Sequence, residues 1–237
     1  MDDFVFPQIA VGLSTHYAHN MTATILFDLD GTLVDSAPDL HAALDRLMTS
    51  RGLATFTRPE VVAMVGDGVR ALVERGLAAR GLPLDEPALE AFTADYIRNA
   101  AVETRAYPGI EAMLERLSTA GWRMAVCTNK PVEAARKLLG ALGLLPHLAA
   151  VCGGDSFAVR KPDPGHLLGT LRIAGGTAER AIMVGDHHND VAAAAAAGIP
   201  CVFAAWGYGK PEMAGAAPVA QNVAALPALL DSLRPRG

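Results

Sequence analysis

Short apolar runs alternate with helical patterns along most of the chain. Apolar side chains repeat at helical spacing between these runs, as they do near residues 110–120, 132–142 and 189–198. Such alternation is typical of parallel strands joined by helices. It predicts an α/β fold with a doubly wound, mostly parallel sheet, whose strands lie near residues 25–27, 123–127, 149–152, 181–184 and 201–204.

The pattern changes between residues 36 and 107, where we find helical periodicity and no strand-like run. Leu40, Leu44 and Leu47 mark the first helix, and further helical patterns cover residues 59–64, 69–80 and 86–101. Proline or glycine residues, which favour turns, occur at both ends of this block. We therefore expect an inserted helical cap at residues 36–107 and an α/β core made of residues 21–35 and 108–237.

The first twenty residues differ from both parts. They start with Met1-Asp2-Asp3 and contain no long apolar stretch, whereas a secretory signal needs a basic start and an apolar core. We expect residues 1–20 to be a disordered extension or the product of a wrongly assigned start. Intact mass and protease resistance of the native protein test this expectation.

Composition narrows the classes of partner. The 237 residues are 51% hydrophobic, which allows a large core, and the net charge of −5 offers no electrostatic attraction to nucleic acid or to an anionic membrane. No apolar stretch reaches the length of a membrane span. The three cysteines, Cys127, Cys152 and Cys201, all fall in expected buried strands and have no metal-binding spacing. These features favour a cytoplasmic protein with reduced thiols.

Polar motifs follow four of the apolar runs, where the strands are expected to end. Parallel sheets bind ligands beyond the carboxyl ends of their strands, so the motifs should meet at one edge. Together they supply several carboxylates, a lysine and a hydroxyl. The motifs are Asp28-Leu29-Asp30-Gly31-Thr32, Thr128-Asn129-Lys130, Lys161-Pro162-Asp163-Pro164 and Gly185-Asp186-His187-His188-Asn189-Asp190.

The first motif suggests covalent catalysis. Asp28 is ionised at neutral pH and can attack phosphorus without a separate base. Asp30 would point to the opposite face of an extended strand, but a turn at Gly31 could bring both carboxylates to the strand end. There Asp30 could protonate a leaving alcohol and then activate water.

The charge balance of the motifs suggests a metal. Asp28, Asp186 and Asp190 would meet an anionic phosphate ester, and two like charges at about 4 Å repel by about 4 kcal/mol at an effective dielectric constant of about 20. Such a site needs cations, and Mg²⁺ suits carboxylate, carbonyl and water ligands. Lys161 can add a positive charge, and Thr128 with the following residues can donate hydrogen bonds to phosphoryl oxygens.

Two histidines and a lysine in these motifs are not assigned a catalytic role. His187 and His188 would point about 100° apart on a helix, so we expect a poor chelating pair at the first turn or in solvent. Lys130 fits a lysine at the rim of the site or on the surface better than it fits the principal phosphate ligand.

The ordered set of motifs resembles the haloacid dehalogenase-like hydrolase superfamily over residues 21–237. The resemblance implies that Asp28 is the nucleophile and Asp30 the acid/base, with Asp28 and the backbone carbonyl of Asp30 also binding Mg²⁺. It implies a Rossmann-like core, and the helical block after the first motif looks like the small helical cap of this superfamily.

The same resemblance assigns the later motifs. Thr128 matches the second motif, and we expect Thr128 and Asn129 to bind phosphate. Lys161 matches the third motif. Asp186 matches a metal ligand of the fourth, in which Asp190 supports either the metal shell or the lysine.

Further strings are similar to the phosphoglycolate phosphatase subfamily. The expected reaction is Mg²⁺-dependent hydrolysis of small phosphate monoesters, above all 2-phosphoglycolate, through an aspartyl-phosphate. The expected partner is therefore a small phosphorylated metabolite, and the protein is expected to be a monomer or homodimer. The strings are Thr128-Asn129-Lys130-Pro131, Gly153-Gly154-Asp155, Arg160-Lys161-Pro162, Val65-Gly66-Asp67-Gly68 and Trp206-Gly207-Tyr208-Gly209.

Several relatives within the superfamily remain as alternatives. A phosphosugar phosphatase, a pyrophosphatase and a phosphomutase would use the same nucleophile, and a catalytically idle paralogue could bind a metabolite. The presence of Asp30 argues against the dehalogenase branch, and the cap has no lysine for the phosphonate-cleaving branch. In the cap, Arg70 or a neighbouring N–H group is our candidate for contact with a substrate carboxylate, against the more general interpretation of a plain helix entry with Asp67 as N-cap and Arg70 on the surface.

Overall fold

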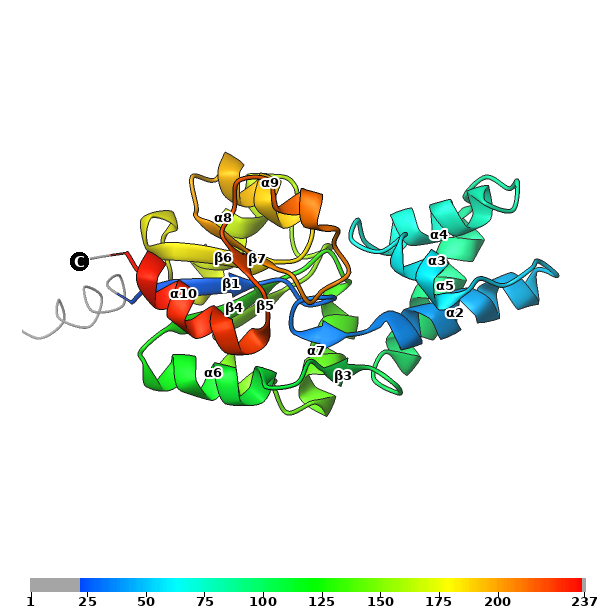
Figure 1. Ribbon diagram of the computed structural model, residues 1–237. Coiled ribbons are helices and arrows are strands. Elements are labelled where there is room, and N and C mark those ends of the chain that lie inside the picture. The colour runs from blue at the N-terminus through cyan, green and yellow to red at the C-terminus, as the bar shows by residue number, and fades with distance from the viewer. Residues whose placement is uncertain (1–21, 236–237) are drawn as a thin grey trace, which may run out of the picture.

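The computed structural model describes residues 22–235 and contains a six-stranded, fully parallel sheet with strand order β5-β4-β1-β6-β7-β8 (Figure 1). The predicted α/β fold class is confirmed. The short strand β8 was not predicted, because two residues carry too little pattern to reveal it. The strands are β1 (Thr24–Phe27), β4 (Arg123–Cys127), β5 (Ala150–Cys152), β6 (Ala181–Gly185), β7 (Cys201–Ala204) and β8 (Val219–Ala220).

Helices cover both faces of the sheet (Figure 1). Side chains of β1 alternate between the faces, as strand geometry requires. Ile25 and Phe27 pack in a core with α6, α7 and α10, whereas Leu26 packs with α8 and α9. The bounds of these helices are α6 (Ile110–Thr119), α7 (Val132–Ala141), α8 (Pro164–Ala174), α9 (His188–Ala196) and α10 (Leu226–Leu233).

Four short 3-10 helices lie in the connections of the core, within the part of the chain that the structure describes. They are η1 (Leu145–His147), η2 (Ala178–Arg180), η3 (Pro211–Ala214) and η4 (Val223–Ala225).

Four helices follow the first motif and pack around an apolar cluster of their own. Leu44, Leu77, Phe92 and Tyr96 are among its fully buried members. Our proposed cap at residues 36–107 contains all four. Figure 1 shows this group beside the sheet rather than on either of its faces. The helices are α2 (Ala37–Ser50), α3 (Arg58–Val62), α4 (Val69–Ala78) and α5 (Glu86–Asn99).

A two-stranded antiparallel ribbon joins these helices to the sheet. Its strands are β2 (Val34–Asp35) and β3 (Arg105–Ala106), with Val34 opposite Ala106. The expectation that residues 36–107 contain no strand is therefore wrong at β3. A two-residue strand of arginine and alanine has no apolar run by which the sequence could have revealed it.

Two expectations concern other parts of the chain. The expected extension at residues 1–20 lies outside the described residues. Among residues 22–235, no helix is both long and apolar enough to cross a membrane.

Candidate active site

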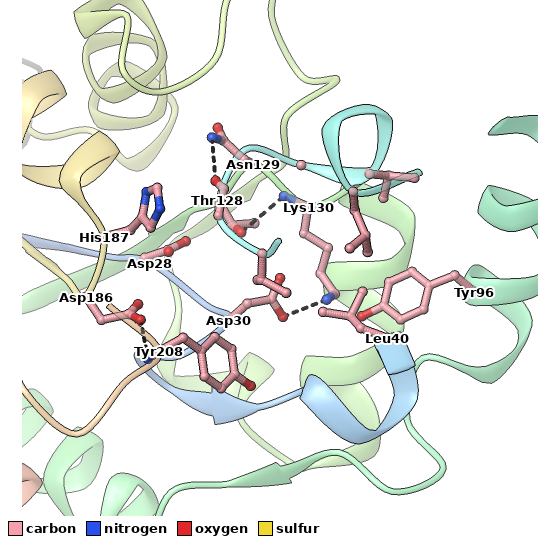
Figure 2. A pocket seen from close by; sticks show the side chains of 15 residues that line it. Asp28, Asp30, Leu40, Tyr96, Thr128, Asn129, Lys130, Asp186, His187 and Tyr208 are labelled. Carbon is pink, nitrogen blue, oxygen red and sulfur yellow. Dashed lines mark hydrogen bonds and ion pairs between the residues drawn. The ribbon is translucent and has the colours of Figure 1, made fainter. Parts of the chain in front are cut away.

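The predicted site residues come from the ends of neighbouring strands. Asp28 follows β1, Thr128 follows β4 and Asp186 follows β6, and these strands are adjacent in the order β4-β1-β6. Their side chains line a single cavity, which α2, α4, α5 and the loop before α4 close from the side of the proposed cap (Figure 2). The expected convergence of the motifs at one edge of the sheet is thus observed in the geometry.

Three carboxylates form the centre of the site. Oxygen atoms of Asp28, Asp186 and Asp190 lie within 4.8 Å of one another, and all three residues are buried. Burial, followed by the charges of Asp28 and Asp190, raises the pKa of Asp186 to about 8. Three buried carboxylates at this spacing, among them Asp186 with its raised pKa, fit a hard divalent cation, which would offset the repulsion between their charges.

Lys161 supplies positive charge to this cluster. Its Nζ lies 2.8 Å from Oδ1 of Asp28 and 2.6 Å from Oδ1 of Asp190. Burial opposes the ammonium charge, but the two carboxylates outweigh it and hold the pKa of Lys161 above its usual value. The lysine therefore stays charged between Asp28 and Asp190.

A tight turn brings Asp30 to the cavity. Gly31 has φ +84°, and the N–H groups of Thr32, Leu33 and Val34 all donate to the carbonyl of Leu29. As a result Asp28 and Asp30 line the same cavity, as expected from a turn at Gly31.

Two donors hold the Asp30 carboxylate. Its Oδ1 accepts hydrogen bonds from the Ser36 hydroxyl at 2.5 Å and from Lys130 Nζ at 2.6 Å. The Lys130 side chain is only 1% exposed. The expectation that Lys130 lies at the rim or on the surface is therefore wrong. The negative charge of Asp30, which follows a different strand, offsets the cost of burying the ammonium.

The loop after β7 contributes to the same centre. Backbone N–H groups of Tyr208 and Gly209 donate to Oδ2 of Asp186 at 2.7 and 3.2 Å, and the Thr32 hydroxyl donates to Oδ1 at 3.0 Å. A Cβ on Gly207 would lie 2.4 Å from the Asp186 Cβ, so only glycine fits this approach. The sequence pointed to this loop only through its similarity to a subfamily string.

Thr128 and Asn129 use their polar atoms differently. Thr128 is buried and lines the cavity, where its Oγ1 accepts from the backbone N–H of Lys130 at 3.3 Å. Asn129 directs its Nδ2 to the carbonyls of Lys161 and Gly66 at 2.9 and 3.1 Å. The Asn129 amide thus positions the lysine loop and a cap loop, and its direct contact with phosphate remains a prediction.

The structure does not bring Arg70 to the other predicted residues. Its side chain is 46% exposed, and its guanidinium pairs with Glu86 at 3.0 Å. Arg70 is also absent from the residues that line the cavity. This geometry gives no support to the expected contact between Arg70 and a substrate carboxylate.

His187 and His188 are oriented differently from two adjacent helical residues. His187 precedes the first turn of α9 in an extended conformation, and the two ring centroids lie 4.1 Å apart. Burial, followed by the proximity of His188, lowers the pKa of His187 to about 4, so the ring is neutral at pH 7. His187 lines the cavity, while His188 is exposed. The expectation that their rings diverge is wrong, because His187 lies outside the helix.

A cap loop rests directly on this part of the core. The Asn189 Nδ2 donates to the carbonyl of Gly66 at 3.3 Å, and a Cβ on Gly66 would lie 2.5 Å from the His187 ring. A Cβ on Gly68 would lie 2.9 Å from the Asn129 carbonyl. The two glycines allow the loop to close over the cavity at van der Waals distance.

Comparison with known proteins agrees with this geometry. A family model of haloacid dehalogenase-like hydrolases matches residues 22–198. The phosphoglycolate phosphatase of Agrobacterium fabrum is 43% identical over 219 residues, which cover 90% of this chain and 94% of that protein. The phosphoglycolate phosphatase of Mesorhizobium japonicum is 44% identical over 188 residues, which cover 78% of this chain and 83% of that protein.

A solved structure is also similar. The crystal structure of a predicted phosphoglycolate phosphatase from Haemophilus somnus has a TM-score of 0.80 at 29% identity, covering 88% of this chain and 97% of that one. The resemblance inferred from the motifs is confirmed, and the chain belongs to the haloacid dehalogenase-like hydrolase family.

Proposed function

We propose that this hydrolase cleaves small phosphate monoesters, with 2-phosphoglycolate as its principal substrate and glycolate and phosphate as its products. The observation that carries the proposal is the assembly of Asp28, Asp186, Asp190 and Lys161 at one edge of the sheet, with Asp30 beside them. Relatives named phosphoglycolate phosphatase at 43–44% identity support a phosphoric monoester hydrolase.

In the first step, a carboxylate oxygen of Asp28 attacks phosphorus. The new O–P bond forms as the bond from phosphorus to the leaving oxygen breaks, and Asp30 gives its proton to that oxygen. Ser36 and Lys130 both donate to Oδ1 of Asp30, so Oδ2 is the oxygen that carries the proton. The alcohol then departs and an aspartyl-phosphate remains on Asp28.

In the second step, Asp30 takes a proton from water. The water oxygen bonds to phosphorus, the bond between phosphorus and Asp28 breaks, and phosphate leaves with the aspartate regenerated. Throughout, the Lys161 ammonium neutralises charge on the side of Asp28 and Asp190. Closure of the cap loop at Gly66 and Gly68 would limit access of water during the first step.

Mg²⁺ is the proposed cofactor. Asp28 and Asp186 supply buried oxygen donors, the backbone carbonyl of Asp30 adds a third by resemblance to the family, and Asp190 lies beside them. When bound, the cation would supply positive charge to the phosphoryl oxygens. Asp190 already pairs with Lys161, which favours a supporting role over direct ligation.

Phosphate release from a panel of phosphorylated metabolites tests the proposal. We expect Mg²⁺-dependent activity with the highest kcat/KM on 2-phosphoglycolate, abolished by EDTA and by Asp28→Asn, while Asp231→Asn retains activity as a matched control. Preference for a phosphosugar or for pyrophosphate would retain the chemistry and overturn the substrate. Absence of release from every ester would point to a phosphomutase or an idle paralogue.

A further inference from the structure

Lys130 lies between the catalytic carboxylates and the cap. It follows β4 in the loop before α7, and its side chain is 1% exposed. The proposed mechanism gives it no step beyond its hydrogen bond to Asp30. The pairing with Asp30 offsets the cost of burying this charge, but it does not explain why the ammonium lies at a cavity.

The surroundings of the Lys130 ammonium leave room for another partner. Its Nζ donates to Oδ1 of Asp30 at 2.6 Å and lies 4.6 Å from the centre of the Tyr96 ring. An ammonium has three N–H donors, and among the described residues only Asp30 accepts one of them. Figure 2 shows the amine at the end of an extended side chain, between Asp30 and Tyr96.

The side chains on the cap side of the cavity are apolar apart from this amine and the Tyr96 hydroxyl. Leu40, Val65, Val69 and Leu72 line it, and the buried Tyr96 hydroxyl has no hydrogen-bond partner among the described residues. Within that part of the chain, Lys130 is the one lysine or arginine that lines the cavity. An anionic leaving group could enter this apolar region only beside a cation.

We infer that Lys130 is a specificity-determining residue that binds the carboxylate of the leaving group. The inference rests on the proposed function and identifies the side chain that would select the substrate of this hydrolase. Arg70, the earlier candidate for this contact, is excluded from the cavity by its pairing with Glu86 at the surface.

The position of Lys130 also limits the length of the substrate. Its Nζ is 2.6 Å from the carboxylate of Asp30, the proposed proton donor to the leaving oxygen. A carboxylate that contacts Lys130 must therefore lie within a few bonds of that oxygen. Phosphoglycolate, in which one methylene separates the leaving oxygen from the carboxyl carbon, meets this requirement, and longer phosphooxy acids meet it less well.

The test compares 2-phosphoglycolate with ethyl phosphate, which has the same chain length and no carboxylate. We expect Lys130→Met to lower the ratio of kcat/KM for the two substrates by about 10- to 100-fold, the loss of one charge-assisted hydrogen bond. The change should fall mainly on KM for phosphoglycolate. Any effect on proton transfer by Asp30 reduces both rates together and cancels in the ratio.

Three controls accompany this comparison. Lys130→Arg should recover part of the ratio, since it keeps the charge, and Lys210→Met should leave the ratio unchanged because Lys210 is exposed. For wild type, 3-phosphooxypropionate, with one more methylene, should give a lower kcat/KM than phosphoglycolate. Lys130→Gln replaces Lys130→Met if thermal melting shows that the methionine variant is unfolded.

The outcomes separate the inference from the proposed function. A wild type that prefers phosphoglycolate, with an unchanged ratio in Lys130→Met, overturns the role of Lys130 and leaves the proposed function intact. A wild type that treats the two esters equally overturns both the substrate and the inference. A wild type that cleaves neither ester but releases phosphate from another phosphorylated metabolite also overturns both the proposed substrate and the role of Lys130.

Discussion

The Nδ2 of Asn189 donates a hydrogen bond to Oδ1 of Asp67 at 2.6 Å, which joins the first turn of α9 to the loop before α4. The two residues are 122 positions apart in the chain. Asp67 also forms an ion pair with Arg75 of α4, so the contact is tied to the helix that follows the loop. One side chain of the core thereby holds the loop that covers the catalytic cavity.

Asn189→Ala should loosen this loop. The variant loses the hydrogen bonds to Asp67 and to the Gly66 carbonyl, and we expect kcat/KM to fall about 5- to 10-fold, as for loss of one or two hydrogen bonds. Hydrogen exchange of residues 64–70 should become faster than in wild type. Unchanged exchange in this segment would show that Asn189 does not hold the loop.

Lys161→Met should strongly destabilise the protein. Asp28 and Asp190 would lose the ammonium that lies between them, and breaking a buried ion pair typically costs about 3–5 kcal/mol. Urea denaturation in EDTA measures the change, with Lys210→Met as the exposed-lysine control. A free energy of unfolding equal to that of wild type would contradict the proposed balance of charge.

Stability should decrease as pH falls from about 6.5 to about 4, owing in part to His166. Burial and the charge of Lys161 lower the pKa of His166 from 6.5 to about 4. In this pH window the unfolded state binds a proton that the folded state excludes, so acid favours unfolding by up to about 3 kcal/mol. Above pH 6.5 the contribution is constant.

His166→Gln should therefore flatten the dependence of unfolding free energy on pH in this window. His147→Gln is the matched control, because His147 is only half-buried. Parallel pH profiles for wild type and His166→Gln would rule out this histidine as a source of acid sensitivity.

Asp39→Ala should destabilise the junction between cap and core. The buried Asp39 carboxylate accepts hydrogen bonds from the backbone N–H groups of Val102, Glu103 and Thr104, between α5 and β3. Loss of a buried acceptor leaves such donors unpaired, and we expect about 2–4 kcal/mol lower unfolding free energy. Asp45→Ala, which removes a half-buried carboxylate of the same helix, should cost less in the same denaturation experiment.

The sequence predicted the parallel sheet and most of its helices because their apolar side chains repeat with the period of each element. It also predicted which motifs meet, since parallel strands end at a common edge. It missed β2, β3 and β8, which are two residues each and owe their pairing to distant segments of the chain. Short elements of this kind are defined by tertiary contacts that no local pattern encodes.

The individual roles of charged residues were harder to predict. Lys130 is buried because Asp30 and Tyr96 come from distant segments, so its own neighbours in sequence contain no sign of burial. Arg70 follows a glycine-rich loop that does approach the site, but its side chain turns to Glu86. The spacing of motifs in the sequence predicted which loops lie at the site. The direction of each side chain depends on tertiary packing and was visible only in the structure.

The strand order has a consequence for synthesis of the chain. Of the strands that the structure describes, β1 is made first, yet it lies in the middle of the sheet between β4 and β6. On the ribosome, one edge of β1 has no partner until residue 127 has emerged and the other has none until residue 185 has emerged. An unpaired apolar strand can associate with other chains, so the emerging polypeptide should depend on chaperones until β6 joins the sheet.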